Sequence, residues 1–131
     1  MKDQIEYYEQ KLNYEMDAWD LNDLIKKGQN VIAIDARSHE SYLKEHIKGA
    51  LSIPYRLMTV ENTSHLDKET LYVSYCDGIG CNASTKGALN LTKLGFNVKE
   101  LIGGLEWWNK DGYETEGTNP ANSSSSTCGC S

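Results

Sequence analysis

The feature that most constrains the fold is residues 71–86, where a short apolar run leads into a glycine-rich loop and then into a helical pattern. The apolar run 71–75 has the length and composition of a buried strand, and Cys76 follows at its end. Gly78 and Gly80 allow the loop backbone to turn sharply. Loop amides and a helix N-terminus favour an anion at such a place. The pattern predicts a strand–loop–helix unit that stabilises a negatively charged sulfur.

The same surroundings are expected to lower the pKa of the Cys76 thiol and to give a nucleophilic thiolate at neutral pH. A buried structural cysteine is the alternative, because free cysteine is among the most buried residue types. The glycine-rich loop favours the reactive interpretation. Cys81 fits equally well as a resolving thiol, a second sulfur relay or a small packed residue. The candidate active-site loop after Cys76 consists of Asp77, Gly78, Ile79, Gly80, Cys81 and Asn82.

Length and charge exclude several classes of protein. The 131 residues suit one domain, and a net charge of −6 argues against a nucleic-acid or acidic-membrane partner. No apolar run approaches the ~20 residues of a spanning helix, and no apolar leader segment is visible at the start. A reducing cytoplasm is therefore the expected location. There the four cysteines indicate reactive or metal-binding thiols rather than a disulfide framework.

Helical and strand patterns alternate along the chain, which predicts an α/β domain on a mainly parallel sheet. Helices are expected at 1–16, 18–27, 39–44, 83–94 and 104–110, and strands at 31–34, 50–53, 71–75 and 98–102. Asp17 and Ser38 are expected to cap helices at their N-termini, and Gly95 is expected to end one. Residues 1–16 form a predicted helical arm, 17–117 the folded domain and 118–131 a flexible tail rich in serine and asparagine.

Two further motifs flank the Cys76 loop: residues 35–38 with 46–54 before it, and residues 95–113 after it. In this order the three motifs resemble those of rhodanese-like sulfurtransferase domains of the single-domain bacterial type, the first being similar to the first signature block of that family and the last to its closing block. Between them, Cys76 falls on the catalytic cysteine of the family. The resemblance covers roughly residues 17–117.

The resemblance implies a parallel five-stranded sheet with helices on both faces and a persulfide formed on Cys76. Sulfur would come from a small donor such as thiosulfate and pass to a thiol acceptor. A cysteine desulfurase or a thioredoxin-like protein is the expected protein partner, and no cofactor is expected. Asp35 and Arg37 are expected to orient the loops by hydrogen bonds. His46 could act as a general base, but satisfying buried polar groups is the expected role.

The loop also departs from the family. Active thiosulfate sulfurtransferases usually carry arginine or lysine in this loop, whereas Asp77 and Cys81 stand where basic residues are common. Losing a charge-assisted contact to the thiosulfate dianion costs about 1.5–3 kcal/mol. Backbone donors alone can still stabilise a persulfide. The sequence therefore predicts sulfur transfer with thiosulfate as a poor donor.

Other functions stay open at this point. Cys76 and Cys81 could form a redox-active disulfide pair, or the chain could be a non-catalytic binding module. A cysteine phosphatase is disfavoured, because Asn82 stands where such an enzyme needs an arginine. Cys128 and Cys130 in the tail are expected either to exchange sulfur with Cys76 or to be idle thiols. Together with Cys76 and Cys81 they could bind zinc, but their spacing is tighter than usual, so no metal is expected.

Overall fold

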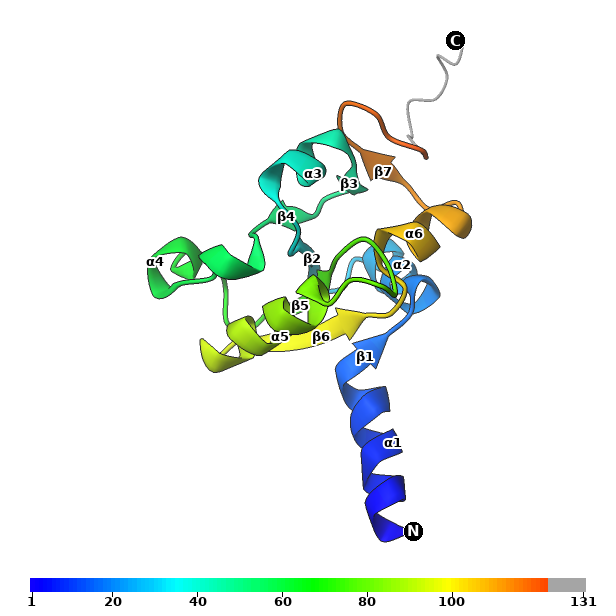
Figure 1. The fold of residues 1–131 in the computed structure, drawn as a ribbon, viewed down its shortest axis with the longest axis vertical. Helices are drawn as coiled ribbons and strands as arrows, with labels where there is room; N and C mark the ends of the chain where they lie inside the picture. The colour runs from blue at the N-terminus through cyan, green and yellow to red at the C-terminus, as the bar shows by residue number, and fades with distance from the viewer. Residues whose placement is uncertain (123–131) are drawn as a thin grey trace.

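A five-stranded parallel sheet forms the centre of the domain in the computed structural model, which describes residues 1–122 (Figure 1). The strand order is β1-β6-β5-β2-β4, and every neighbouring pair runs parallel. The strands are β1 (Glu15–Met16), β2 (Val31–Asp35), β4 (Leu51–Ser52), β5 (Leu71–Tyr75) and β6 (Asn97–Leu101). The α/β class and the parallel five-stranded sheet implied by the resemblance are confirmed.

Helices cover both faces of this sheet, because neighbouring residues of each buried strand point to opposite sides. On β5, Val73 and Tyr75 pack in a cluster with residues of α2 and α6, whereas Tyr72 packs in a second cluster with residues of α5. Cys76 belongs to the second cluster. The helices are α1 (Lys2–Tyr14), α2 (Ala18–Lys26), α3 (His39–Lys44), α4 (Val60–Thr63), α5 (Ala83–Lys93) and α6 (Gly104–Lys110).

The helix boundaries follow the signals expected from the sequence. The Asp17 carboxylate accepts a hydrogen bond from the Asp20 amide at 2.9 Å, and the Ser38 hydroxyl accepts one from the Ser41 amide at 3.2 Å. Helix α5 stops shortly before Gly95, whose φ of +92° lies in the region that favours glycine. The caps and the stop predicted at these positions are confirmed.

Several short elements were not expected. Strands β3 (His46–Ile47) and β7 (Thr115–Glu116) form a separate antiparallel pair, and a 3₁₀-helix spans Tyr55–Leu57. Strand β1 lies within the range predicted as the helical arm, yet it pairs with β6 at the edge of the sheet. Strands β1, β3 and β7 have two residues each, too short for a period-2 pattern, and unlike β4 none of them lies in a predicted strand.

Residues 118–122, the first part of the predicted flexible tail, are hydrogen-bonded to the domain. The Thr118 and Asn119 amides donate to the carbonyls of Leu43 and Lys44 at 3.0 and 2.8 Å. The Ala121 amide donates to the Glu45 carboxylate at 2.7 Å. These bonds satisfy groups at the end of α3, which explains why residues 118–122 follow the domain surface. Cys128 and Cys130 lie outside the described residues.

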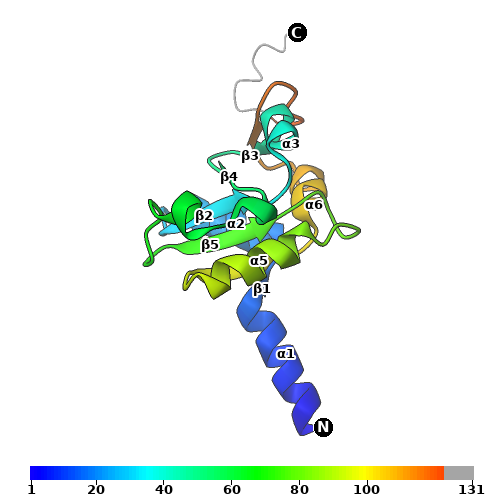
Figure 2. The same ribbon diagram turned by 60° about the vertical axis from the view of Figure 1, so that its left-hand side comes forward.

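Helix α1 projects from the domain at the end opposite α3 and the β3–β7 pair (Figures 1 and 2). None of its residues is buried. No helix within residues 1–122 combines the length and the apolar character needed to cross a membrane.

Candidate active site

Cys76 lies at the carboxyl end of β5, beneath the loop that leads to α5, and only 1% of its surface is exposed. Its Sγ atom lies 3.1 Å from the Cys81 carbonyl oxygen, 3.5 Å from Ser84 Oγ and 3.9 Å from the Gly78 carbonyl oxygen. A carbonyl oxygen can only accept, so the thiol hydrogen is the donor in the shortest of these contacts. The resting site is therefore arranged around a neutral thiol.

The pKa of Cys76 accordingly moves in the opposite direction from the one the sequence predicted. Burial raises the pKa of the Cys76 thiol, and the nearby Cys81 thiol raises it further. The backbone amide of Ser84, and its hydroxyl when that hydroxyl donates to the sulfur, lower it, but by less. The expectation of a lowered pKa is wrong for the resting protein, because burial of the thiol and the nearby Cys81 thiol outweigh the donors of Ser84.

Helix α6 holds the backbone of the loop from the other side. The Leu105 amide donates to the Cys76 carbonyl at 2.9 Å, and the Glu106 amide donates to the Asp77 carbonyl at 2.8 Å. This approach requires Gly104, which has φ +56° and whose Cβ would collide with the Cys76 carbonyl oxygen. At Gly78 a Cβ would lie 2.7 Å from the Glu106 carboxylate. The glycine of the closing block thus helps to position the cysteine.

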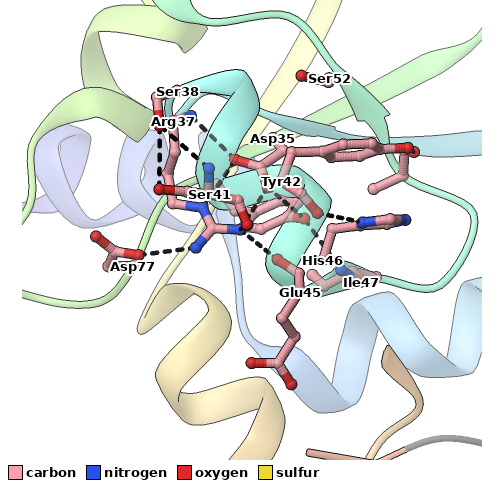
Figure 3. Close-up of polar contacts among 12 residues, drawn as sticks. Asp35, Arg37, Ser38, Ser41, Tyr42, Glu45, His46, Ile47, Ser52 and Asp77 are labelled. Carbon is pink, nitrogen blue, oxygen red and sulfur yellow. Dashed lines mark hydrogen bonds and ion pairs between the residues drawn. The ribbon is translucent and has the colours of Figure 1, made fainter. Parts of the chain in front are cut away.

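Arg37 ties the loop to the end of β2 (Figure 3). Its guanidinium donates to both oxygens of Asp35, at 2.9 and 2.7 Å, and to Asp77 Oδ1 at 2.9 Å. It also donates to the Glu45 carbonyl at 2.6 Å. Burial lowers the pKa of Arg37, but the Asp35 and Asp77 carboxylates more than offset this and raise it overall. Arg37 is therefore charged. It connects the loop after β5, through Asp77, to the end of β2, through Asp35.

Asp35 is fully buried and also receives the Tyr75 hydroxyl at 3.1 Å. That hydroxyl in turn accepts from the Ile47 amide at 3.0 Å. Burial, and next the Asp35 charge, keep the pKa of Tyr75 well above its ordinary value, so Tyr75 stays a neutral donor. The strand end that carries Cys76 is thereby fixed to β2 and β3.

His46 lies in a different set of contacts. Its Nδ1 donates to the Tyr42 carbonyl at 2.7 Å, its Nε2 lies 3.2 Å from Glu116, and its ring stacks on Tyr42 with centroids 3.7 Å apart. The Gly49 amide donates to Glu116 and, with the His46 contact, lowers the pKa of that carboxyl. Within residues 1–122 the hydrogen bonds of His46 go to α3 and β7 rather than to the Cys76 loop. This geometry gives His46 a structural role.

Two cavities flank the loop, and Cys81 lines both of them while Cys76 lines neither. One, of about 230 Å³, contains Ser84 and Glu100. The other, of about 370 Å³, contains Arg37 and Arg56. A reagent in either cavity therefore meets Cys81 first. Ile79 is 77% exposed at the loop tip, and Asn82 precedes α5 with no capping hydrogen bond from its side chain.

The larger cavity is lined by Arg56, a second cation beside Arg37, which no sequence motif indicates as a site residue. Arg56 lies over the Tyr55 ring at 5.3 Å, and Lys86 lies over the same ring at 5.2 Å. Arg56 lies two residues after the first signature block, and the fold brings it into the same cavity as Asp77 and Cys81. The described residues hold no group of three or more His, Cys, Asp or Glu side chains suited to a metal ion.

Cys81 is expected to react with iodoacetamide faster than Cys76 at pH 7, by at least about tenfold, because Cys76 is buried and its pKa is raised. The rate at Cys76 should still be rising with pH above about 8.5, the pKa of a free thiol. Fragment-ion mass spectrometry separates the two sites, and the unfolded chain, in which both react alike, is the control. Faster labelling of Cys76 at pH 7 would contradict the resting geometry described above.

Comparisons with known proteins all point to one family. A family model described as a rhodanese-like domain matches residues 17–111. The chain is 39% identical over 95 residues to thiosulfate sulfurtransferase GlpE of Coxiella burnetii, covering 71% of this chain and 81% of the relative. It is 29% identical over 105 residues to the chloroplastic thiosulfate sulfurtransferase 16 of Arabidopsis thaliana, covering 72% and 86%. The crystal structure of the BH2092 protein of Bacillus halodurans matches with a TM-score of 0.84 at 44% identity, covering 89% and 86%. The chain therefore belongs to the rhodanese-like domain family.

Proposed function

We propose that this protein is a sulfurtransferase or sulfur carrier that holds a sulfane sulfur on Cys76 as a persulfide and passes it to a thiol acceptor. The observation that carries the proposal is the position of Cys76, at the end of β5 and 3.5 Å from the Ser84 hydroxyl in the first turn of α5. A reactive sulfur at this junction has a hydrogen-bonding group directed at it from a helix N-terminus. Members of the family that it matches are named thiosulfate sulfurtransferases.

The proposed reaction has two displacements. The Cys76 thiolate, its proton lost to solvent, attacks the sulfane sulfur of the donor, the donor S–S bond breaks, and the donor remainder leaves with the electron pair. The acceptor thiolate then attacks the outer sulfur of the Cys76 persulfide, and the Cys76 thiolate leaves. No net oxidant or reductant is required. Because Cys76 is 1% exposed, loop residues 77–82 must move aside for each attack.

Loading with sulfur tests this proposal directly. Reduced protein is mixed in turn with thiosulfate, with glutathione persulfide, and with a cysteine desulfurase supplied with cysteine. Intact mass spectrometry then measures the added mass. We expect a gain of one sulfur that maps to Cys76 and is removed by a small thiol. Absence of any gain with all three donors would refute the proposal.

A thiol–disulfide function is the second candidate, because two free cysteines lie in the same loop and the Cys81 thiol contributes to the raised pKa of Cys76. A Cys76–Cys81 disulfide would appear in the same mass spectra as a loss of two hydrogens. A cytoplasmic location suits either candidate, because thiols stay reduced there.

Thiosulfate is expected to be a poor donor compared with glutathione persulfide, because the exposed Asp77 carboxylate both repels a dianion and occupies the Arg37 guanidinium at 2.9 Å. Asp77→Arg should lower the apparent KM for thiosulfate by about tenfold or more, with kcat little changed. Steady-state kinetics at constant ionic strength measures this effect. Asp111→Arg, which makes the same charge change at the other end of α6, is the matched control. Saturation of the unmodified protein at micromolar thiosulfate would contradict the prediction.

A further inference from the structure

The Ser84 hydroxyl lies between two groups that compete for its single hydrogen. Ser84 Oγ lies 2.8 Å from Glu100 Oε2 and 3.5 Å from Cys76 Sγ. Thr85 Oγ1 lies 2.7 Å from the same Glu100 oxygen. An ionised carboxylate only accepts, so both hydroxyls donate to Glu100. The hydrogen of Ser84 therefore points away from the sulfur, and its lone pairs face Cys76.

This arrangement suits a thiol and opposes an anion. A neutral Cys76 can donate its S–H to the Cys81 carbonyl or to Ser84 Oγ. A thiolate or a persulfide would instead face lone pairs on both oxygens, with the Ser84 backbone amide but not the Ser84 hydroxyl as a donor. Rotation of the Ser84 O–H from Glu100 to Cys76 would replace one of these two repulsive contacts by a hydrogen bond to the anionic sulfur.

The backbone and side-chain oxygen of Ser84 are held in place, so the direction of its O–H bond is what can change. Ser84 is buried in the first turn of α5, and its backbone carbonyl accepts from the Ser74 hydroxyl at 2.9 Å. Glu100 lies on β6, on the strand face that packs against α5. Helix α5 thus fixes the position of Ser84, and strand β6 fixes the position of Glu100.

We propose that Glu100 is a positioning residue that sets the charge state of Cys76 through Ser84, holding the hydroxyl in the resting protein and releasing it to an anionic sulfur. This role deepens the proposed function, because a site that keeps its thiol neutral until a donor arrives is protected from adventitious electrophiles. Ionisation of Cys76 can be measured without any sulfur donor, so this inference stands or falls separately from sulfur transfer.

Other charged groups around the site bear on its titration. The Cys81 thiol and the Asp77–Arg37 pair lie in or against the loop, and the Glu106 carboxylate of α6 lies against Gly78. On the edge strand, Glu15 is the register partner of Glu100 and pairs with Lys11 at 2.7 Å. Within the described chain, Glu100 is the charged group that receives the Ser84 hydroxyl. The test must therefore separate this hydrogen bond from simple charge repulsion.

The pH dependence of Cys76 alkylation by iodoacetamide, followed by fragment-ion mass spectrometry, provides that separation. Glu100→Val removes the acceptor and suits a strand, whereas Glu100→Gln removes the charge but keeps an oxygen acceptor for Ser84. We expect Glu100→Val to lower the midpoint of the Cys76 profile by about one pH unit or more, which is roughly tenfold faster labelling at pH 7. Glu100→Gln should shift it by less than half as much.

Four further variants complete the test: Ser84→Ala, Ser84→Ala/Glu100→Val, Glu106→Gln and Glu100→Ala. In a Ser84→Ala background, Glu100→Val should shift the midpoint no more than Glu106→Gln does, since Glu106→Gln reports the effect of a nearby charge alone. Glu100→Ala is measured beside Glu100→Val, and thermal unfolding of each variant identifies any packing defect. Equal shifts for Glu100→Gln and Glu100→Val, or a Glu100→Val shift that persists fully without the Ser84 hydroxyl, would overturn the proposal. No shift in either Glu100→Val or Glu100→Ala would overturn it as well.

Discussion

Cys76→Ser is expected to abolish sulfur loading and to lower turnover by more than about a thousandfold, since a serine hydroxyl cannot form the persulfide. The fold should change little. A serine hydroxyl at this position can donate to the Cys81 carbonyl, which lies 3.1 Å from the present sulfur, so a buried polar group is not left unpaired. Loss of stability should stay within about 1.5 kcal/mol. Intact mass after exposure to a persulfide donor, steady-state turnover and thermal unfolding measure the three quantities.

Cys81→Ser is the matched control for this prediction, because it makes the same atomic change five residues along the same loop. It should load sulfur on Cys76 and retain turnover, since Cys81 lines the approach to the buried thiol but is not the proposed nucleophile. The contrary pattern, with loading preserved in Cys76→Ser and lost in Cys81→Ser, would move the nucleophile to Cys81. Loss in both variants would instead indicate a function that needs the pair.

The parts of the fold with strong local signals could be predicted from the sequence. The long apolar strand β5 and the glycine that ends α5 each produce a pattern within a few neighbouring residues. The Asp17 and Ser38 caps follow from side chains that bond their own backbone three residues on. Strand β1 gave no such signal, because its stability comes from pairing with β6, far away along the chain.

The chemistry of the site depended on contacts that no local pattern encodes. Ser84 meets Glu100 and Arg37 meets Asp77 only after the sheet order β6-β5-β2 has brought their elements together. Burial is the largest cause of the raised pKa of Cys76, and the packing that buries this thiol is not encoded in the loop itself. A glycine-rich loop also permits either a carbonyl or an amide to face the sulfur, so composition alone could not decide between a stabilised thiolate and a stabilised thiol.

Arg37→Leu is expected to destabilise the protein by about 3–5 kcal/mol, because it leaves the fully buried Asp35 carboxylate without its ionic partner. Asp35 would keep only the Tyr75 hydroxyl among its present side-chain donors. In a domain of this size the loss corresponds to a fall in Tm of roughly 10–20 °C. Thermal and denaturant unfolding measure it. Arg56→Leu, at an exposed arginine, is the matched control and should stay within about 0.5 kcal/mol.

The double variant Asp35→Leu/Arg37→Leu separates the stability of the pair from its effect on the loop. Removing both charges should recover much of the stability lost in Arg37→Leu, because no uncompensated charge stays buried. Turnover should not recover with it, since the Arg37–Asp77 contact at 2.9 Å that ties the Cys76 loop to β2 is absent in both variants. Recovery of turnover together with stability would show that Arg37 acts only through folding. Persistent loss of turnover in a stable double variant would assign to Arg37 the positioning of the loop.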